Sequence, residues 1–154
     1  MASNLLKNGS FEDTTFSPWS SYVADSAAGS IALDHTVGEN GDTSAKITVT
    51  QSNRNDYWSV ELEQSNLGLT QGRTYTITFW AKASQKRSGQ MCVQLNAVPW
   101  TQYLLKDFSL TTTWTEYSYT FTSATTVADA LFDFDLAEST GTVWFDSVSV
   151  SLLS

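Results

Sequence analysis

The feature that most constrains how this chain folds is an alternation of apolar and polar side chains along several short segments. In residues 74–81 the apolar positions are 75, 77, 79 and 81, and similar alternation runs through 91–96 and 116–121. Successive side chains of a β-strand point to opposite faces, so a period of two predicts half-buried strands. The pattern also predicts strands over residues 29–36, 45–50, 58–63, 132–136 and 143–150. No segment shows a convincing long helix.

Turn signals that contain glycine separate several of these segments, at residues 40–42, 71–73, 88–90 and 140–142. Many short strands joined by tight turns are typical of two packed antiparallel sheets. The sequence therefore predicts an all-β fold, a β-sandwich of the jelly-roll type with two antiparallel sheets. A chain of 154 residues is one domain and can bury a core without disulfides or a metal. We expect residues 4–154 to form this domain, preceded by an expression start at residues 1–3.

Composition excludes several classes of partner and chemistry. The formal net charge is −8 at pH 7. A surface this acidic repels phosphate groups, so we expect neither nucleic acid nor a membrane as a partner. An acidic surface instead suits a neutral ligand or a bound cation. The single cysteine, Cys92, excludes an intrachain disulfide, and with the single histidine, His35, it leaves almost no material for a zinc site or Cys–His catalysis.

Two of the six tryptophans point to a function. Trp19 and Trp100 each follow one of the only two prolines of the chain. Proline is confined to turns, edges and strand ends, so we expect both indoles to be displayed on loops. An exposed, flat indole suits stacking against the apolar face of a sugar ring. The alternative is that each indole plugs one end of the sandwich core.

The polar faces of three predicted strands carry a second signal. They present only carboxylates and amides at alternate positions, namely Glu61 and Glu63, Gln94 and Asn96, and Asp133 and Asp135. If these strands are neighbours, they form a polar floor with Trp100 at its rim. Aromatic walls over such a floor make a groove for an oligosaccharide. The alternative is an acidic face exposed to solvent.

Four segments of the chain resemble carbohydrate-binding modules of families 4, 16 and 22, and they occur in the right order. Residues 4–12, Asn-Leu-Leu-Lys-Asn-Gly-Ser-Phe-Glu, are similar to the opening of these modules, and residues 72–82 to their central strand. Residues 114–122 and 143–150 resemble two later strands. Families 4 and 16 fit better than family 22, whose groove pattern of Arg, Trp, Tyr and Glu is not clearly reproduced. The resemblance implies a jelly roll, a structural calcium ion and a sugar-binding groove, in a module usually appended to a secreted glycoside hydrolase.

The resemblance also implies which residues hold the calcium ion. The acidic ligands are Glu12 of the opening segment and Asp146 of the closing segment, and main-chain oxygens come from Ser10, Thr43 and Lys46. Calcium takes six to eight oxygen ligands, which carboxylates and carbonyls supply. The site would tie the two ends of the chain together, so we expect a structural role. The alternative is that Glu12 and Asp146 are ordinary turn residues.

For the sugar site, the resemblance implies Trp19 and Trp100 as stacking residues. It adds Trp58 as a rim residue, although the alternation of Trp58 with Val60 and Leu62 points it to the core. We expect the polar floor to be formed by Gln94, Asn96, Glu61, Glu63 and Asp133. The expected function is non-catalytic binding of β-1,4-linked gluco- and manno-oligosaccharide chains, such as cellulose-type glucan and glucomannan. The expected setting is a secreted monomeric module that targets a covalently linked catalytic domain to plant cell-wall polysaccharide.

Two other classes of function stay open. A jelly-roll glycoside hydrolase or lyase would use Glu61 and Glu63, because paired carboxylates cleave glycosidic bonds. The β-glucanase motif Glu-x-Asp-x-x-Glu is incomplete, since Asn66 stands in place of its last acid. A protein-interaction sandwich would instead present exposed apolar patches.

Overall fold

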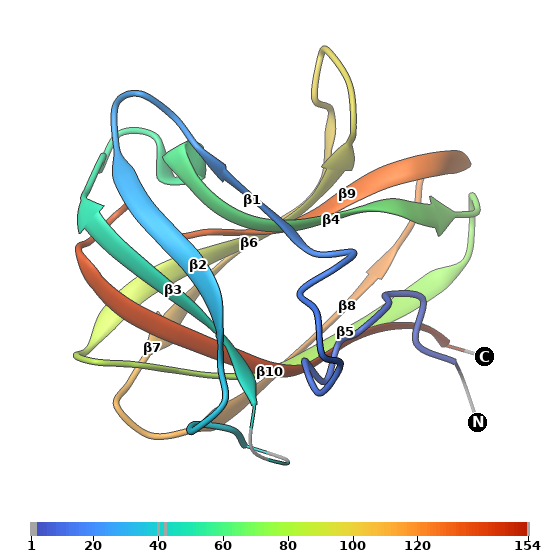
Figure 1. Cartoon of the computed structure of the whole chain (residues 1–154). Coiled ribbons are helices and arrows are strands. Elements are labelled where there is room, and N and C mark those ends of the chain that lie inside the picture. The colour runs from blue at the N-terminus through green and yellow to red at the C-terminus, as the bar shows by residue number, and fades with distance from the viewer. Residues whose placement is uncertain (1–2, 40, 42, 154) are drawn as a thin grey trace.

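Two antiparallel five-stranded sheets, packed face to face, make up the computed structural model, which describes residues 3–39, 41 and 43–153 (Figure 1). The first sheet has the order β1 (Ser20–Val23), β4 (Val60–Leu69), β9 (Val127–Asp135), β6 (Arg87–Leu95) and β7 (Gln102–Leu110). The second has the order β2 (Ala28–Asp34), β3 (Ser44–Gln51), β10 (Gly141–Leu153), β5 (Thr74–Ala83) and β8 (Thr115–Thr122). The predicted all-β sandwich is confirmed.

Every segment predicted as a strand overlaps an observed strand, but β1 and β7 have no predicted counterpart. β1 is only four residues long, too short for an alternation to be recognised. β7 carries Tyr103, Leu104 and Leu105 in a row at the edge of its sheet, which hides its period. Among the described residues, helical structure is limited to the short 3-10 helix Tyr57–Ser59 before β4, and no helix there is long and apolar enough to span a membrane.

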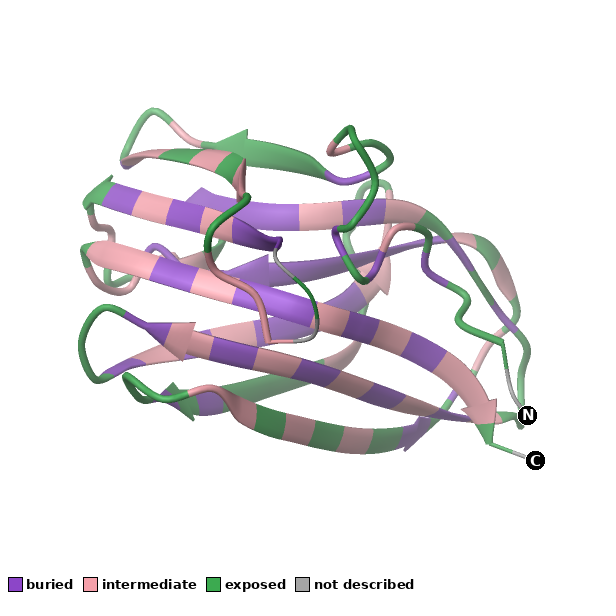
Figure 2. Ribbon diagram, turned by 60° about the horizontal axis from the view of Figure 1, so that its bottom comes forward, coloured by how far each residue is buried: buried purple, intermediate pink, exposed green. Residues whose placement is uncertain are grey.

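Aromatic side chains from both sheets form the centre of the core. Phe134 of β9 stacks on Phe145 of β10 with ring centroids 3.9 Å apart. Phe79 of β5 meets Phe134 edge-on, with centroids 4.9 Å apart. All three side chains are fully buried. Figure 2 shows buried and less buried residues alternating along the strands, which is the pattern read from the sequence.

The opening segment of the chain is tied to β10. Asn4 donates from Nδ2 to the main-chain oxygen of Val148 at 2.9 Å, and its Oδ1 accepts the main-chain N–H groups of Leu6 and Val150 at 3.0 and 3.1 Å. A Cβ at Gly9 would lie 2.0 Å from the main-chain oxygen of Val148. The contact between the two ends of the chain therefore requires glycine at this position.

The prediction that Trp19 is displayed on a loop is wrong. Only 4% of its surface is exposed. Its ring packs against Phe11 and Phe132, with centroids 5.3 and 6.3 Å away. Its indole N–H donates to the main-chain oxygen of Asn8 at 2.9 Å, so its one polar atom is satisfied. Trp19 closes the sandwich core, as the alternative interpretation of this residue held.

Trp19→Ala should lower the free energy of unfolding by about 3–5 kcal/mol, the usual cost of truncating a large buried aromatic side chain. Denaturant unfolding of wild type and variant measures this difference. Trp100→Ala is the matched control, because 47% of Trp100 is exposed. It should change the free energy by less than about 1 kcal/mol. Equal losses in the two variants would contradict the buried position of Trp19.

Candidate functional site

A groove of about 490 Å³ lies over the outer face of the first sheet. Its walls and floor come from β1, β4, β9, β6 and β7, from the 3-10 helix before β4, and from the loop after β6. Six of the residues predicted for a sugar site line it, namely Trp58, Glu61, Glu63, Gln94, Asn96 and Trp100. Trp19 is not among the lining residues, because it lies in the core.

The strand order explains why the polar side chains meet. β9 lies between β4 and β6, so the three polar strands are neighbours. Glu61 pairs with Asp135 and Glu63 pairs with Asp133 across the β4–β9 ladder. Residues directly opposite each other in a ladder point to the same face. The alternation therefore sends these four carboxyl groups to the groove side and the residues between them to the core.

Two half-exposed indoles stand at the ends of the groove. Trp58 is 46% exposed and precedes β4, whereas Trp100 is 47% exposed and follows β6. β4 and β6 both run antiparallel to β9, so they are parallel to each other. The start of one and the end of the other consequently lie at opposite ends of the groove. Tyr22 of β1 stacks beside Trp58, with ring centroids 6.4 Å apart and planes at 29°.

The two amide side chains predicted for the floor each donate a hydrogen bond to a carboxylate. Gln94 Nε2 donates to Asp133 Oδ2 at 3.0 Å. Asn96 Nδ2 donates to Asp129 Oδ2 at 3.1 Å. These bonds orient both amides, so that their positions on the floor are set before any ligand arrives.

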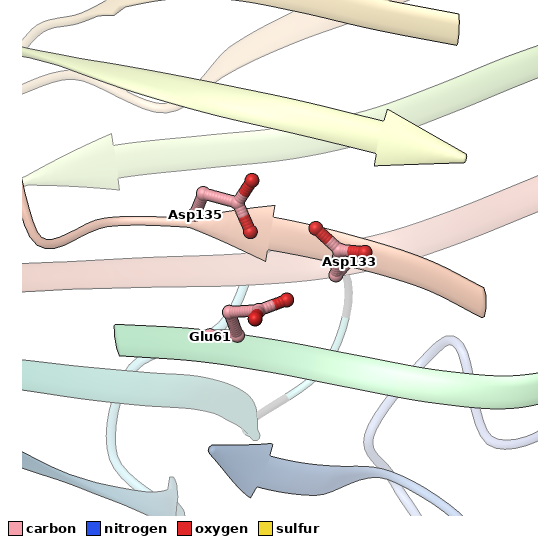
Figure 3. A group of neighbouring side chains, drawn as sticks. All are labelled: Glu61, Asp133 and Asp135. Atoms are coloured by element: carbon pink, nitrogen blue, oxygen red, sulfur yellow. The ribbon is translucent and has the colours of Figure 1, made fainter. Parts of the chain in front are cut away.

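Glu61, Asp133 and Asp135 form an acidic cluster at the base of the groove (Figure 3). One carboxyl oxygen of each lies within 4.8 Å of the others, and the three residues are 7%, 0% and 5% exposed. Burial raises the pKa of Glu61 to about 9, and the neighbouring charge of Asp135 adds to this effect. Burial also raises the pKa of Asp133 and of Asp135. Three bare charges are disfavoured here, so the cluster favours a bound proton or cation.

The structure also shows groove residues that the sequence did not identify, namely Tyr22, Gln90, Gln102 and Leu131. Gln90 shares the strand face of Gln94, a signal that could have found it. Tyr22 and Gln102 belong to the two strands without a clear sequence pattern. Asp133, predicted as part of the floor, lies beneath it and is fully buried.

The acidic residues of the predicted calcium site converge on the loop before β3. Glu12 Oε2 accepts the main-chain N–H of Thr43 at 3.0 Å. Asp146 is fully buried, and its Oδ2 accepts the main-chain N–H of Glu39 at 2.9 Å. A Cβ at Gly41 would lie 2.7 Å from Glu12 Oε1. Residues from both ends of the chain thus meet at one loop.

The other predicted ligands fit this place unequally. Thr43 belongs to the loop itself, and Ser10 precedes Phe11 in the opening segment next to Glu12. Lys46 lies inside β3, paired with Ala32 on one side and with Trp144 on the other. Its main-chain oxygen therefore lies within the sheet. Two carboxylates and loop carbonyls are the donors that calcium prefers, so the site fits calcium by the type of its atoms.

Comparison with known proteins shows the family. Residues 3–141 match the family model CBM_4_9, described as a carbohydrate binding domain. The solved structure described as "CBM4 structure and function" is 27% identical over 95% of this chain and 98% of that chain, with a TM-score of 0.77. The comparison with curated proteins gives no match.

Two further solved structures share the fold. The CBM22-1 xylan-binding domain of Xyn10C from Paenibacillus barcinonensis is 13% identical over 99% of this chain and 96% of that chain, with a TM-score of 0.74. The N-terminal cellulose-binding domain of β-1,4-glucanase C from Cellulomonas fimi is 20% identical over 88% of this chain and 89% of that chain, with a TM-score of 0.64. The family model spans most of the sequence, and the groove displays two indoles over a polar floor. The chain therefore belongs to the carbohydrate binding domain family, as a module that binds polysaccharide.

Proposed function

We propose that the groove binds a single soluble chain of β-1,4-linked glucose or mannose units, as in cellulose-type glucan and glucomannan, and that it performs no chemistry on that chain. The placement of Trp58 and Trp100 at opposite ends of a polar floor is the observation that carries this proposal. Each indole offers a flat apolar face to one sugar ring. The carboxyl and amide groups between them exchange hydrogen bonds with the sugar hydroxyls.

A single chain suits this surface better than a crystalline face does. The aromatic residues flank a hollow of about 490 Å³, whereas a crystalline face would need a flat row of rings. The linkage is supported by the relatives, since one similar structure is a cellulose-binding domain and another a xylan-binding domain. Xylan lacks the hydroxymethyl group of glucan and mannan. A calorimetric panel of glucan, glucomannan, mannan and xylan oligosaccharides therefore tests the proposed preference.

The chain is further proposed to be a secreted, monomeric module that holds a linked glycoside hydrolase on plant cell-wall polysaccharide. In support, the similar cellulose-binding domain comes from a β-1,4-glucanase. Hydrolysis by this chain itself is less well supported. Asn66 occupies an exposed position next to an irregularity in β4, and it is not a groove residue. Release of reducing sugar by the pure protein would overturn the non-catalytic role.

Glu12 and Asp146 are proposed to bind a structural calcium ion, together with main-chain oxygens of Ser10 and Thr43. In support, both carboxylates lie at this loop although they come from opposite ends of the chain. The ion would neutralise charge on the two carboxylates at this loop. It would also hold the opening segment against β10, where Asn4 and Gly9 make their contacts.

Trp58→Ala and Trp100→Ala should each weaken binding of cellohexaose or mannohexaose roughly tenfold to more than a hundredfold, because losing an aromatic hot spot costs on the order of 1–3 kcal/mol. Isothermal titration calorimetry measures the affinity. Trp114→Ala is the control: Trp114 precedes β8 of the second sheet, where the Lys82 ammonium lies 5.4 Å from its ring centre. This control should keep wild-type affinity. Unchanged affinity in both groove variants would overturn the proposed platforms.

Gln94→Ala should weaken binding by a factor that differs between gluco- and manno-oligosaccharides, whose units differ in the direction of one hydroxyl group. Hydrogen bonds of an amide are directional, so the amide discriminates between the two orientations of that hydroxyl group. An indole contacts only the flat face of the ring and does not. Loss of one hydrogen bond is worth about 1 kcal/mol. Calorimetry with both sugars measures the two factors, and Gln85→Ala, exposed between β5 and β6, is the control. Identical losses for both sugars would contradict this role of Gln94.

Glu12→Gln should lower the melting temperature measured in the presence of Ca²⁺, because an ion that binds only the folded state stabilises it by mass action. The same variant should lose most of the increase in melting temperature that added Ca²⁺ gives the wild type. Asp13→Asn, at the neighbouring exposed residue, is the control and should keep that increase. A wild type whose melting ignores both Ca²⁺ and chelator would refute the structural ion.

A further inference from the structure

We propose that the acidic cluster of Glu61, Asp133 and Asp135 is a calcium-binding site in the groove floor, separate from Glu12 and Asp146, and that its ion coordinates hydroxyl oxygens of the bound sugar. The first half of this proposal concerns the protein alone. The second half rests on the proposed function of the groove.

The geometry of the cluster fits one ion. One carboxyl oxygen from each residue lies within 4.8 Å of the other two. Calcium–oxygen distances are roughly 2.3–2.6 Å, so two oxygens bound to one ion lie at most about 5 Å apart. The three carboxyl groups come from β4 and β9 and point toward one another (Figure 3). Donors of this kind, all hard oxygens, select calcium over softer metals.

Unsatisfied oxygen atoms give a second, independent indication. Glu61 Oε2, Asp133 Oδ1 and Asp135 Oδ1 are all buried, and no N–H or hydroxyl donor among the described residues reaches them. The hydrogen bonds open to these carboxyl groups are to one another, through a shared proton. Leaving a buried carboxylate oxygen without a partner is costly. The amide of Gln94 donates to the other oxygen of Asp133, which fixes that carboxyl group and leaves Oδ1 facing the cluster. A cation between the three residues would satisfy all three oxygens together.

The neighbouring charges that act most strongly on the cluster are negative. The charges that act on the three groups come from the cluster itself and from Glu63. Repulsion between these carboxylates raises the pKa of Glu61 and of Asp133 further. A divalent cation would neutralise two of the three charges at their centre, where Coulomb attraction in a buried site is strongest.

The position of the cluster brings the ion into reach of a ligand. Glu61 and Asp135 line the groove, whereas Asp133 lies beneath it. Three carboxylates cover one side of the ion, and calcium takes six to eight oxygen ligands. The remaining positions face the groove, beside the end where Trp58 and Tyr22 stand. Water fills these positions in the free protein, and two neighbouring sugar hydroxyls replace it in the complex.

Calorimetric titration of Ca²⁺ into chelator-treated protein tests the site. Glu61→Gln and Asp135→Asn should each bind one Ca²⁺ fewer than the wild type. Glu63→Gln is the matched control, because it removes a neighbouring groove carboxylate that is not a member of the cluster. It weakens the Coulomb repulsion on Glu61 but removes no proposed ligand, so it should keep the wild-type stoichiometry. Both cluster variants are nearly isosteric and remove repulsion, so we expect them to melt no lower than the wild type in chelator. Equal stoichiometry in wild type and cluster variants would overturn the site.

A measurement on the wild type alone guards against a variant that fails to fold. In a ¹³C spectrum of the side-chain carboxyl carbons, added Ca²⁺ should shift the resonances of Glu61, Asp133 and Asp135. Resonances of these three residues that stay in place up to millimolar Ca²⁺, while the protein remains folded, would also overturn the site.

The sugar contact is tested by cellohexaose affinity with Ca²⁺ and with chelator. Wild-type affinity should fall about tenfold in chelator, equivalent to about 1.4 kcal/mol. Asp135→Asn should show no such dependence, whereas Glu12→Gln should keep it. Calcium bound at the cluster with unchanged sugar affinity would overturn the sugar contact. Calcium bound there with no affinity for any β-1,4-linked oligosaccharide would instead refute the proposed function and leave the metal site standing.

Discussion

The alternation of phenylalanine and aspartate along residues 132–135 of β9 is the constraint on which both the core and the groove depend. Phe132 and Phe134 point into the core, where Phe134 stacks on Phe145 of the opposite sheet with centroids 3.9 Å apart. Asp133 and Asp135, between and beyond them, point to the groove. A slip of one residue would exchange the two faces and place carboxyl groups in an aromatic core. The pairing register that builds the core is therefore the same register that places the acidic cluster.

The sequence predicts the strands better than it predicts their neighbours. Alternation identifies β4, β6 and β9 and the polar face of each, because side-chain direction is a local property of a strand. Whether the three polar faces meet is decided by the strand order, in which β9 lies between β4 and β6. That order is set by packing between distant segments. Alternation alone therefore could not show that Asp133 and Asp135 are buried, because β9 lies between the neighbouring strands β4 and β6.

Trp19 and Trp100 show the same limit at single residues. Both follow a proline, so the local sequence predicts a turn at each. In the structure, however, Trp19 is 4% exposed and Trp100 is 47% exposed. Trp19 is buried because its ring packs against Phe11 and its N–H donates to the main-chain oxygen of Asn8. Both partners belong to the opening segment, which is distant from the core strands in the sequence. For Trp58 the alternation alone points to the core, whereas the structure places the indole at the groove. The 3-10 helix Tyr57–Ser59 interrupts the alternation there.

The groove combines two kinds of recognition that rest on different parts of the fold. Trp58 stands on the 3-10 helix that leads into β4, and Trp100 stands on the loop between β6 and β7, so strands of one sheet set the spacing between the two indoles. A ligand chain that reaches both gains two stacking contacts for one loss of translational freedom, whereas a shorter chain gains only one. The two amides of the floor are already held by carboxylates, Gln94 by Asp133 and Asn96 by Asp129. The buried carboxyl group of Asp133 thus orients an amide that recognises sugar hydroxyls, and the same group takes part in the repulsion within the acidic cluster. A cation bound at the cluster would both offset that repulsion and keep the carboxyl groups in place.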